Sequence, residues 1–196
     1  NMTVFNTFWK VINKYKGTII LFTVMLVAFG GINTTSSNNS LDFTNNKPDI
    51  LIINNDQNKG LTKNLISYLK ENKKRVKGIF LTHGHFENDG AIQDIAESLS
   101  GIPIYGSKFT IALLKKELEM KKVSTKNLVE IPAYKTLNVG HVKVFPVGLS
   151  HSIPDNLGYA IYTKDGVIFY ASDFVFDAMM RGHYQTDMGK LAYIGK

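Results

Sequence analysis

Short apolar runs, separated by polar stretches, organise the chain from residue 49 onward. Runs rich in β-branched and aromatic residues are typical of buried strands. In other stretches, apolar residues recur every three or four positions with Lys and Glu between them, which predicts amphipathic helices. The predicted strands are 49–54, 76–82, 102–105, 142–147, 159–162 and 167–171, and the predicted helices are 61–74, 91–99 and 108–121.

The order of these elements indicates the fold class. Strands alternate with helices up to residue 121, whereas the last strands follow one another, with a hairpin turn predicted at Lys164-Asp165-Gly166. This order predicts an α/β protein with sheets inside and helices outside. A chain of 196 residues is long enough to bury the core of one such domain.

The apolar run 18–29 allows two interpretations. Lysines precede it and Gly30-Gly31 closes it, an arrangement typical of a signal peptide or a membrane anchor. However, the run is shorter than the about 20 residues that cross a bilayer comfortably. Its β-branched and aromatic residues favour one or two buried strands. We favour the strands, and membrane contact by residues 18–29 is the alternative.

The polar stretch 33–46 is rich in Asn, Ser and Thr, and predicts a loop or linker. We therefore divide the chain at residue 48. Residues 1–48 form an N-terminal apolar segment and polar linker, which could supply the first strands of the fold. Residues 49–196 form the main domain.

Composition narrows the functions that the chain can serve. A hydrophobic content of 44% with 20% charged residues is ordinary for a folded protein and excludes wholesale disorder. The net charge of +7 favours a polyanionic partner such as nucleic acid or an anionic membrane surface. The absence of cysteine excludes disulfides and thiolate metal sites, so any metal must be held by His and carboxylate groups. A chain without cysteine also fits a cytoplasmic location.

Candidate metal ligands follow three of the predicted strands. His83 and His85 lie just after the strand 76–82, and in an extended loop two such imidazoles can reach one ion. His151 and Asp173 follow two later strands, and loops at one edge of a layered sheet are where sites are usually assembled. Three imidazoles and one carboxylate oxygen would satisfy Zn²⁺, which could activate water for hydrolysis.

Each of these residues also has a structural explanation. A His-X-His after a strand occurs by chance, and His151 alone could be a hydrogen-bonded loop histidine. Asp173 alone could form a turn or cap a helix. For the other two histidines, His141 in a predicted turn and His183 in a polar segment, the structural explanation is favoured.

Five segments of the chain carry a more specific signal. They are Arg75-Val76-Lys77-Gly78-Ile79-Phe80-Leu81-Thr82-His83-Gly84-His85, Ile102-Pro103-Ile104-Tyr105-Gly106, His151-Ser152-Ile153-Pro154-Asp155, Ser172-Asp173-Phe174-Val175-Phe176-Asp177 and Thr186-Asp187-Met188-Gly189-Lys190-Leu191-Ala192. In order and spacing, these segments resemble the ribonuclease J family, which comprises metallo-β-lactamase-fold ribonucleases of the β-CASP group.

The resemblance implies a fold and an activity. The fold would be an α/β, metallo-β-lactamase-like αββα sandwich, of which this chain would hold an incomplete N-terminal portion that ends before the β-CASP region. The activity would be that of a metal-dependent RNA hydrolase, a 5′-to-3′ exonuclease and endonuclease in RNA decay and maturation. RNA would be the partner, and the cytoplasm the location.

The resemblance also assigns roles to single residues. His83, His85 and His151 match the ligands of one zinc ion, and Asp173 matches a carboxylate shared by two. Glu87 and Asn88 stand where the family pattern has Asp and His. Glu87 keeps an oxygen ligand, but Asn88 offers only a neutral amide oxygen, which binds zinc poorly. The resemblance thus implies one zinc site, an incomplete second site, and Glu87 and His151 as candidates for catalytic roles.

Two functions therefore stay open from the sequence. The first is a ribonuclease J-like hydrolase. The second is a catalytically weak paralogue that serves as an RNA-binding or partner subunit of an active ribonuclease J, and homo-oligomer formation is also open. The residues at positions 87 and 88 favour the second function, whereas the histidines favour the first.

Overall fold

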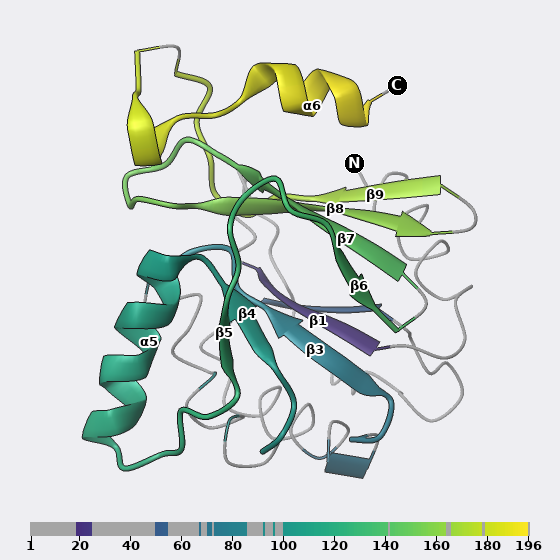
Figure 1. Ribbon diagram of the computed structural model, residues 1–196, viewed down its shortest axis with the longest axis vertical. Helices are drawn as coiled ribbons and strands as arrows, with labels where there is room; N and C mark the ends of the chain where they lie inside the picture. Colours follow the sequence, from purple (N-terminus) through teal and green to yellow (C-terminus); the bar gives the residue numbers. More distant parts are fainter. Residues whose placement is uncertain are drawn as a thin grey trace, which may run out of the picture.

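The computed structural model describes residues 67, 70, 71, 73–85, 92, 96, 100–140, 142–163, 166–177 and 179–195, and the backbone of residues 19–24 and 50–54. These residues form two sheets that lie one above the other (Figure 1). Helix α5 lies beside the first sheet, and α6 lies beyond the second. The prediction of an α/β sandwich is confirmed.

The first sheet is entirely parallel, with the strand order β2-β1-β3-β4-β5. The predicted strands 49–54, 76–82 and 102–105 are confirmed, although the last begins two residues later. The fifth strand was not predicted. The strands are β1 (Ile19–Val24), β2 (Ile50–Asn54), β3 (Val76–Phe80), β4 (Ile104–Gly106) and β5 (Leu128–Glu130).

Strand β1 lies within the run 18–29, for which the sequence left two interpretations. It pairs in parallel with both β2 and β3, so this part of the run is an inner strand of the sheet. The rest of the run lies outside the described residues. Among the described residues, no helix has both the length and the apolar character needed to cross a membrane.

The second sheet is antiparallel, with the strand order β6-β7-β8-β9. The three predicted strands in this part of the chain are confirmed, and the pairing of Thr163 with Gly166 fits the predicted hairpin. The short first strand was not predicted. The strands are β6 (Leu137–Val139), β7 (Val142–Gly148), β8 (Leu157–Thr163) and β9 (Gly166–Tyr170).

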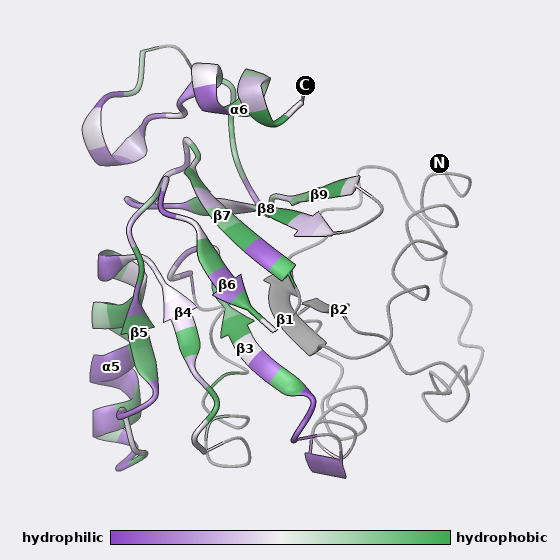
Figure 2. Ribbon diagram, turned by 45° about the vertical axis from the view of Figure 1, so that its right-hand side comes forward, coloured by the Kyte–Doolittle hydropathy of each residue, from purple (hydrophilic) through white to green (hydrophobic). Residues whose placement is uncertain are grey.

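The hydrophobic core lies between the two sheets. Phe80 at the end of β3 stacks on Tyr105, with 4.7 Å between ring centroids, and meets Tyr159 of β8 edge-on at 5.3 Å. Hydrophobic residues dominate the strands β5, β7 and β8, whereas α5 carries both kinds (Figure 2). The buried cluster draws on both sheets and consists of Phe80, Ile131, Val139, Val144, Leu157, Tyr159, Ile161 and Tyr170.

Helix α5 (Lys108–Met120) matches the predicted helix 108–121 closely. It begins after Ser107, whose Oγ accepts a hydrogen bond from the Thr110 N–H, an N-cap arrangement. Its buried residues recur at helical spacing, as the sequence pattern predicted: Thr110, Ile111, Leu114 and Leu118.

The other helices are described in part or were not predicted. Within the predicted helices 61–74 and 91–99, five described residues are helical: Ser67, Lys70, Glu71, Ile92 and Ala96. Lys73 and Lys74 lie in a turn, so the end predicted for the first helix is wrong. A 3-10 turn at Gly182–Tyr184 and helix α6 (Met188–Ile194) were missed. Neither contains a buried residue, and each is too short to show a clear helical period in the sequence.

Candidate metal centre

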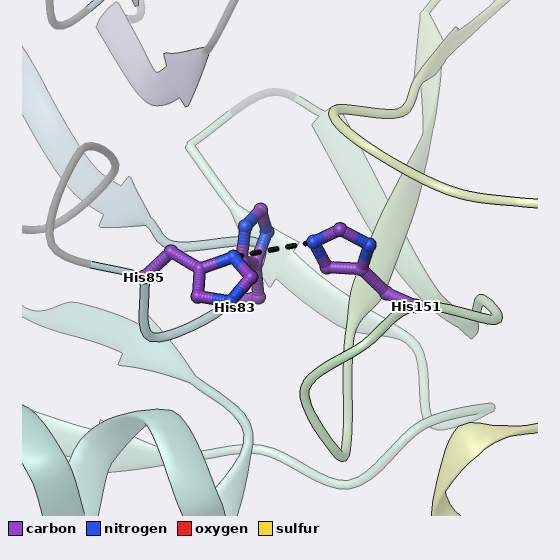
Figure 3. Close-up of side chains that lie close together, drawn as sticks. All are labelled: His83, His85 and His151. Atoms are coloured by element: carbon purple, nitrogen blue, oxygen red, sulfur yellow. Dashed lines mark hydrogen bonds between the residues drawn. The ribbon is translucent and has the colours of Figure 1, made fainter.

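The candidate ligands lie in loops that follow three strands. His83 and His85 follow β3 of the first sheet, whereas His151 follows β7 and Asp173 follows β9 of the second sheet. The loops bring the three imidazole rings together, although His85 and His151 are 66 positions apart (Figure 3). The site therefore lies where the two layers of the sandwich meet.

The three imidazoles form a compact cluster. The ring centroids of His83, His85 and His151 lie 4.7 to 4.9 Å apart, and each pair meets at a steep angle. The Nε2 atom of His151 lies 3.2 Å from Nδ1 of His85. One ring nitrogen from each histidine lies within 4.8 Å of the others.

Burial and a neighbouring hydroxyl hold His83 in one orientation. The residue is fully buried, and its Nδ1 lies 3.1 Å from the Oγ1 of Thr82. Its Nε2 lies 4.0 Å from Oδ2 of Asp173. Thr82 thus engages one ring nitrogen, and the other lies on the side of Asp173.

The environment also keeps His83 neutral. Burial, together with the neighbouring His151 and His85, lowers the pKa of its imidazole from the ordinary 6.5 to about 3. A side-chain contact with Asn156 acts in the opposite direction. A neutral imidazole has a lone pair available to a metal ion, so this shift favours the form that binds metal.

The glycine between the two histidines permits the close approach of helix α5. A Cβ atom at Gly84 would lie 2.8 Å from Cδ1 of Leu113 and 3.6 Å from Cα of Thr110. The first distance is shorter than normal contact, so a larger residue would require the Leu113 side chain to move. The helix thus supports the loop that carries His83 and His85.

The donor set fits a metal ion such as zinc. Zinc holds nitrogen ligands at about 2.0–2.1 Å, so that two of them lie at most about 4.2 Å apart. The histidine nitrogens, all within 4.8 Å, are a small ring rotation away from that arrangement. Asp173 adds a carboxylate on the side of His83, and its side chain is 23% exposed.

The structure brings some of the predicted site residues together, whereas others lie outside the described residues. His83, His85 and His151 come together, and Asp173 approaches them from β9. Glu87 and Asn88 lie outside the described residues, so the predicted second metal site and the catalytic role of Glu87 stay predictions. His183 is not part of the cluster, and its Nδ1 lies 2.6 Å from Oδ1 of Asp155. His141 lies outside the described residues.

Sequence reasoning missed the residues that support the ligands. The Ser150 N–H donates to Oγ1 of Thr186 at 2.6 Å, and the two hydroxyls lie 2.7 Å apart, which ties the His151 loop to the segment before α6. The Tyr159 hydroxyl donates to the Leu81 carbonyl beneath the His83 loop. Thr186 stood in a segment that resembles a known family, but nothing in the sequence paired it with Ser150.

Comparison with known protein families agrees with the observed fold. Residues 57–188 match the family described as "Beta-lactamase superfamily domain". The chain therefore belongs to the β-lactamase superfamily, and its fold is that of the metallo-β-lactamases.

Within this superfamily, the chain is similar to part of ribonuclease J 2. It is 41% identical to ribonuclease J 2 of Staphylococcus aureus (strain MRSA252) over 137 residues, which cover 67% of this chain and 24% of that protein. It is also 41% identical to ribonuclease J 2 of Staphylococcus epidermidis over 136 residues, which cover 66% of this chain and 23% of that protein. The chain spans about a quarter of the length of the curated relatives that it matches.

Solved structures with the same fold are more distant. A metallo-β-lactamase of Cronobacter sakazakii, a mutant of the HARLDQ motif, covers 69% of this chain and 57% of its own, with a TM-score of 0.46 and 10% sequence identity. The match to the metallo-β-lactamase fold protein YhfI of Bacillus subtilis covers 61% of this chain and 48% of that protein, with a TM-score of 0.45 and 17% sequence identity.

Proposed function

We propose that this chain forms the metal-binding part of a ribonuclease J-like RNA hydrolase. The observation that carries the proposal is the convergence of His83, His85 and His151, which places three ring nitrogens within 4.8 Å of one another. The chain that builds this cluster is 41% identical to proteins named ribonuclease J 2, and the substrate class is taken from that name.

The residues would share the work as follows. His83, His85, His151 and Asp173 would hold the ion, which we take to be zinc because the ligands are nitrogen and oxygen only. When bound, such an ion would supply Lewis-acid activation of water and of the phosphodiester. The low pKa of His83 keeps its ring neutral, and the Asp173 carboxylate offsets part of the positive charge.

The direction of substrate approach follows from burial. His83 is fully buried, whereas His85 and His151 are half-buried. The phosphodiester would therefore reach the centre from the side of His85 and His151, and we assign His151 and Glu87 to the reacting side. The net charge of +7 favours the approach of a polyanion such as RNA. The 5′-to-3′ exonuclease and endonuclease activities and the cytoplasmic location belong to the same proposal.

A second candidate function rests on one feature of the sequence. Asn88 offers a neutral amide oxygen where the family pattern has an imidazole, so a second zinc would lack a nitrogen ligand. On this alternative, the protein binds one zinc and acts as an RNA-binding or partner subunit of an active paralogue or of its own homo-oligomer.

RNA cleavage by the natural full-length protein tests the proposal. We expect metal-dependent cleavage that a chelator stops and that the double variant His83→Ala/His85→Ala abolishes. His183→Ala is the matched control, because His183 is exposed and lies outside the cluster. Cleavage that persists in the double variant would refute the metal mechanism. Cleavage that appears only when an active paralogue is added would favour the second candidate.

A further inference from the structure

Asn156 is a buried polar residue in the loop between His151 and β8. It is only 1% exposed, and a buried carboxamide normally needs partners for both its nitrogen and its oxygen. Its Nδ2 donates to the backbone carbonyl of Asp173 at 2.7 Å. Its Oδ1 is buried, and the side chain also contacts the His83 imidazole.

The backbone around Asn156 is bonded to the other two ligand loops. The Asn156 carbonyl accepts a hydrogen bond from the Leu149 N–H at 2.9 Å, which closes the loop that carries His151. The next N–H, that of Leu157, donates to the carbonyl of Thr82 at 2.9 Å, directly before His83. Asn156 and its neighbour therefore contact all three loops that supply the candidate ligands.

The chemistry of this side chain is unusual for a residue that only fills space. Leu has the same branched shape but could form no hydrogen bond to the Asp173 carbonyl. Asp would place a second negative charge beside Asp173 and would lose the donor. Only a neutral amide donates to the Asp173 carbonyl at this position without adding charge.

We propose that Asn156 is a positioning residue of the metal centre, which holds the Asp173 loop against the His83 imidazole through its hydrogen bond to the Asp173 carbonyl. The bond fixes the backbone from which the carboxylate projects, and that carboxylate lies 4.0 Å from His83 Nε2. Partners of this kind set the orientation of metal ligands, and their loss costs about 10- to 100-fold in affinity or activity. This inference rests on the metal centre of the proposed function.

The chain offers a matched control. Asn127 makes the same type of bond, from Nδ2 to the carbonyl of Ile102 at 2.8 Å. That bond lies at the amino-terminal ends of β4 and β5, whereas His83 follows the carboxyl end of the parallel neighbour β3. Asn127→Ala therefore removes an equivalent bond far from the histidines.

The test measures metal binding in the natural full-length protein and in Asn156→Ala, Asn156→Leu and Asn127→Ala. Zn²⁺ affinity is determined by competition with a chromophoric chelator, and Co²⁺ absorption reports the ligand geometry. We expect both Asn156 variants to bind Zn²⁺ about 10- to 100-fold more weakly and to change the Co²⁺ spectrum. We expect Asn127→Ala to bind as the natural protein does.

Asn156→Leu keeps the branched shape and removes the donor, but Leu is larger than Asn, so the smaller Asn156→Ala is compared beside it. Natural affinity and an unchanged Co²⁺ spectrum in Asn156→Leu would overturn the inference and leave the metal centre intact. Failure of Asn156→Leu to fold would show a structural role and would also count against the inference. Absence of metal binding in the natural protein would overturn the metal centre and the inference together.

Discussion

Two His–Asp contacts in this molecule differ in their distance and in the burial of the histidine. His183 and Asp155 lie 2.6 Å apart, with 77% of the His183 side chain and 27% of the Asp155 side chain exposed. His83 and Asp173 lie 4.0 Å apart, and the His83 side chain is fully buried. The tighter pair is at the surface, and the looser pair belongs to the histidine cluster.

The difference shows what marks a functional site. A surface pair is screened by water and contributes little to stability. At the cluster, burial, two further imidazoles and a carboxylate converge on one point, and burial holds the pKa of His83 near 3. Convergence and a shifted pKa are thus more informative than a short contact.

The largest expected contrast between the two regions concerns metal binding. His151→Ala removes one of three nitrogen ligands, and we expect Zn²⁺ affinity to fall by more than about 100-fold, since even the loss of a supporting partner costs that much. His183→Ala should leave the affinity unchanged. Chelator competition and metal content measure both variants. An equal loss of Zn²⁺ affinity in the two variants would contradict the difference between the cluster and the surface pair.

A smaller contrast concerns the stability of the metal-free protein. The unfolded His83 ring takes up a proton below about pH 6.5, whereas the folded ring stays neutral down to about pH 3. The unfolded state therefore binds more protons in this window, and stability falls as pH falls. We expect a loss of about 3 kcal/mol between pH 6.5 and pH 4.

Urea unfolding in the presence of a chelator measures this loss. His83→Gln is the informative variant, because it removes the titrating ring and should flatten the pH dependence. His183→Gln should leave the slope as it is. A His83→Gln protein with the slope of the natural protein would contradict the assigned burial effect.

The smallest effect is expected at the surface pair itself. Asp155→Asn removes the charge from the contact with His183 and should change the free energy of unfolding by less than about 1 kcal/mol. Asp155 has a φ of +57°, a left-handed conformation that Asn tolerates well. Urea unfolding at neutral pH measures this change. A loss of several kcal/mol in the free energy of unfolding would mean that the pair is important for stability.

The sequence predicted the longer strands and α5 because their apolar patterns are clear. The strands β5 and β6 have three residues each, which is too short for a periodic pattern. Helix α6 has seven residues and buries none of them, so its apolar positions form too short a pattern to predict a helix. The extension of β8 back to Leu157 was also missed, since Leu157-Gly158 carries little strand signal.

The candidate ligands could be predicted from the sequence because they follow strands. The residues that hold the ligand loops in place could not be predicted in this way. Thr82 and His83 are neighbours, so their contact is local. The bonds from Ser150 to Thr186 and from Tyr159 to Leu81 join residues 36 and 78 positions apart. Such partners are set by how the layers pack, which a single sequence does not reveal.

The separation of 66 positions between His85 and His151 has a thermodynamic consequence. An ion that holds both residues joins one sheet to the other. It also closes the long loop of chain between the two histidines. A covalent link of that span would remove unfolded-state entropy equivalent to about 4 kcal/mol. Metal binding would then be part of the folding free energy, so the cohesion of the two layers would depend on the metal supply of the cell.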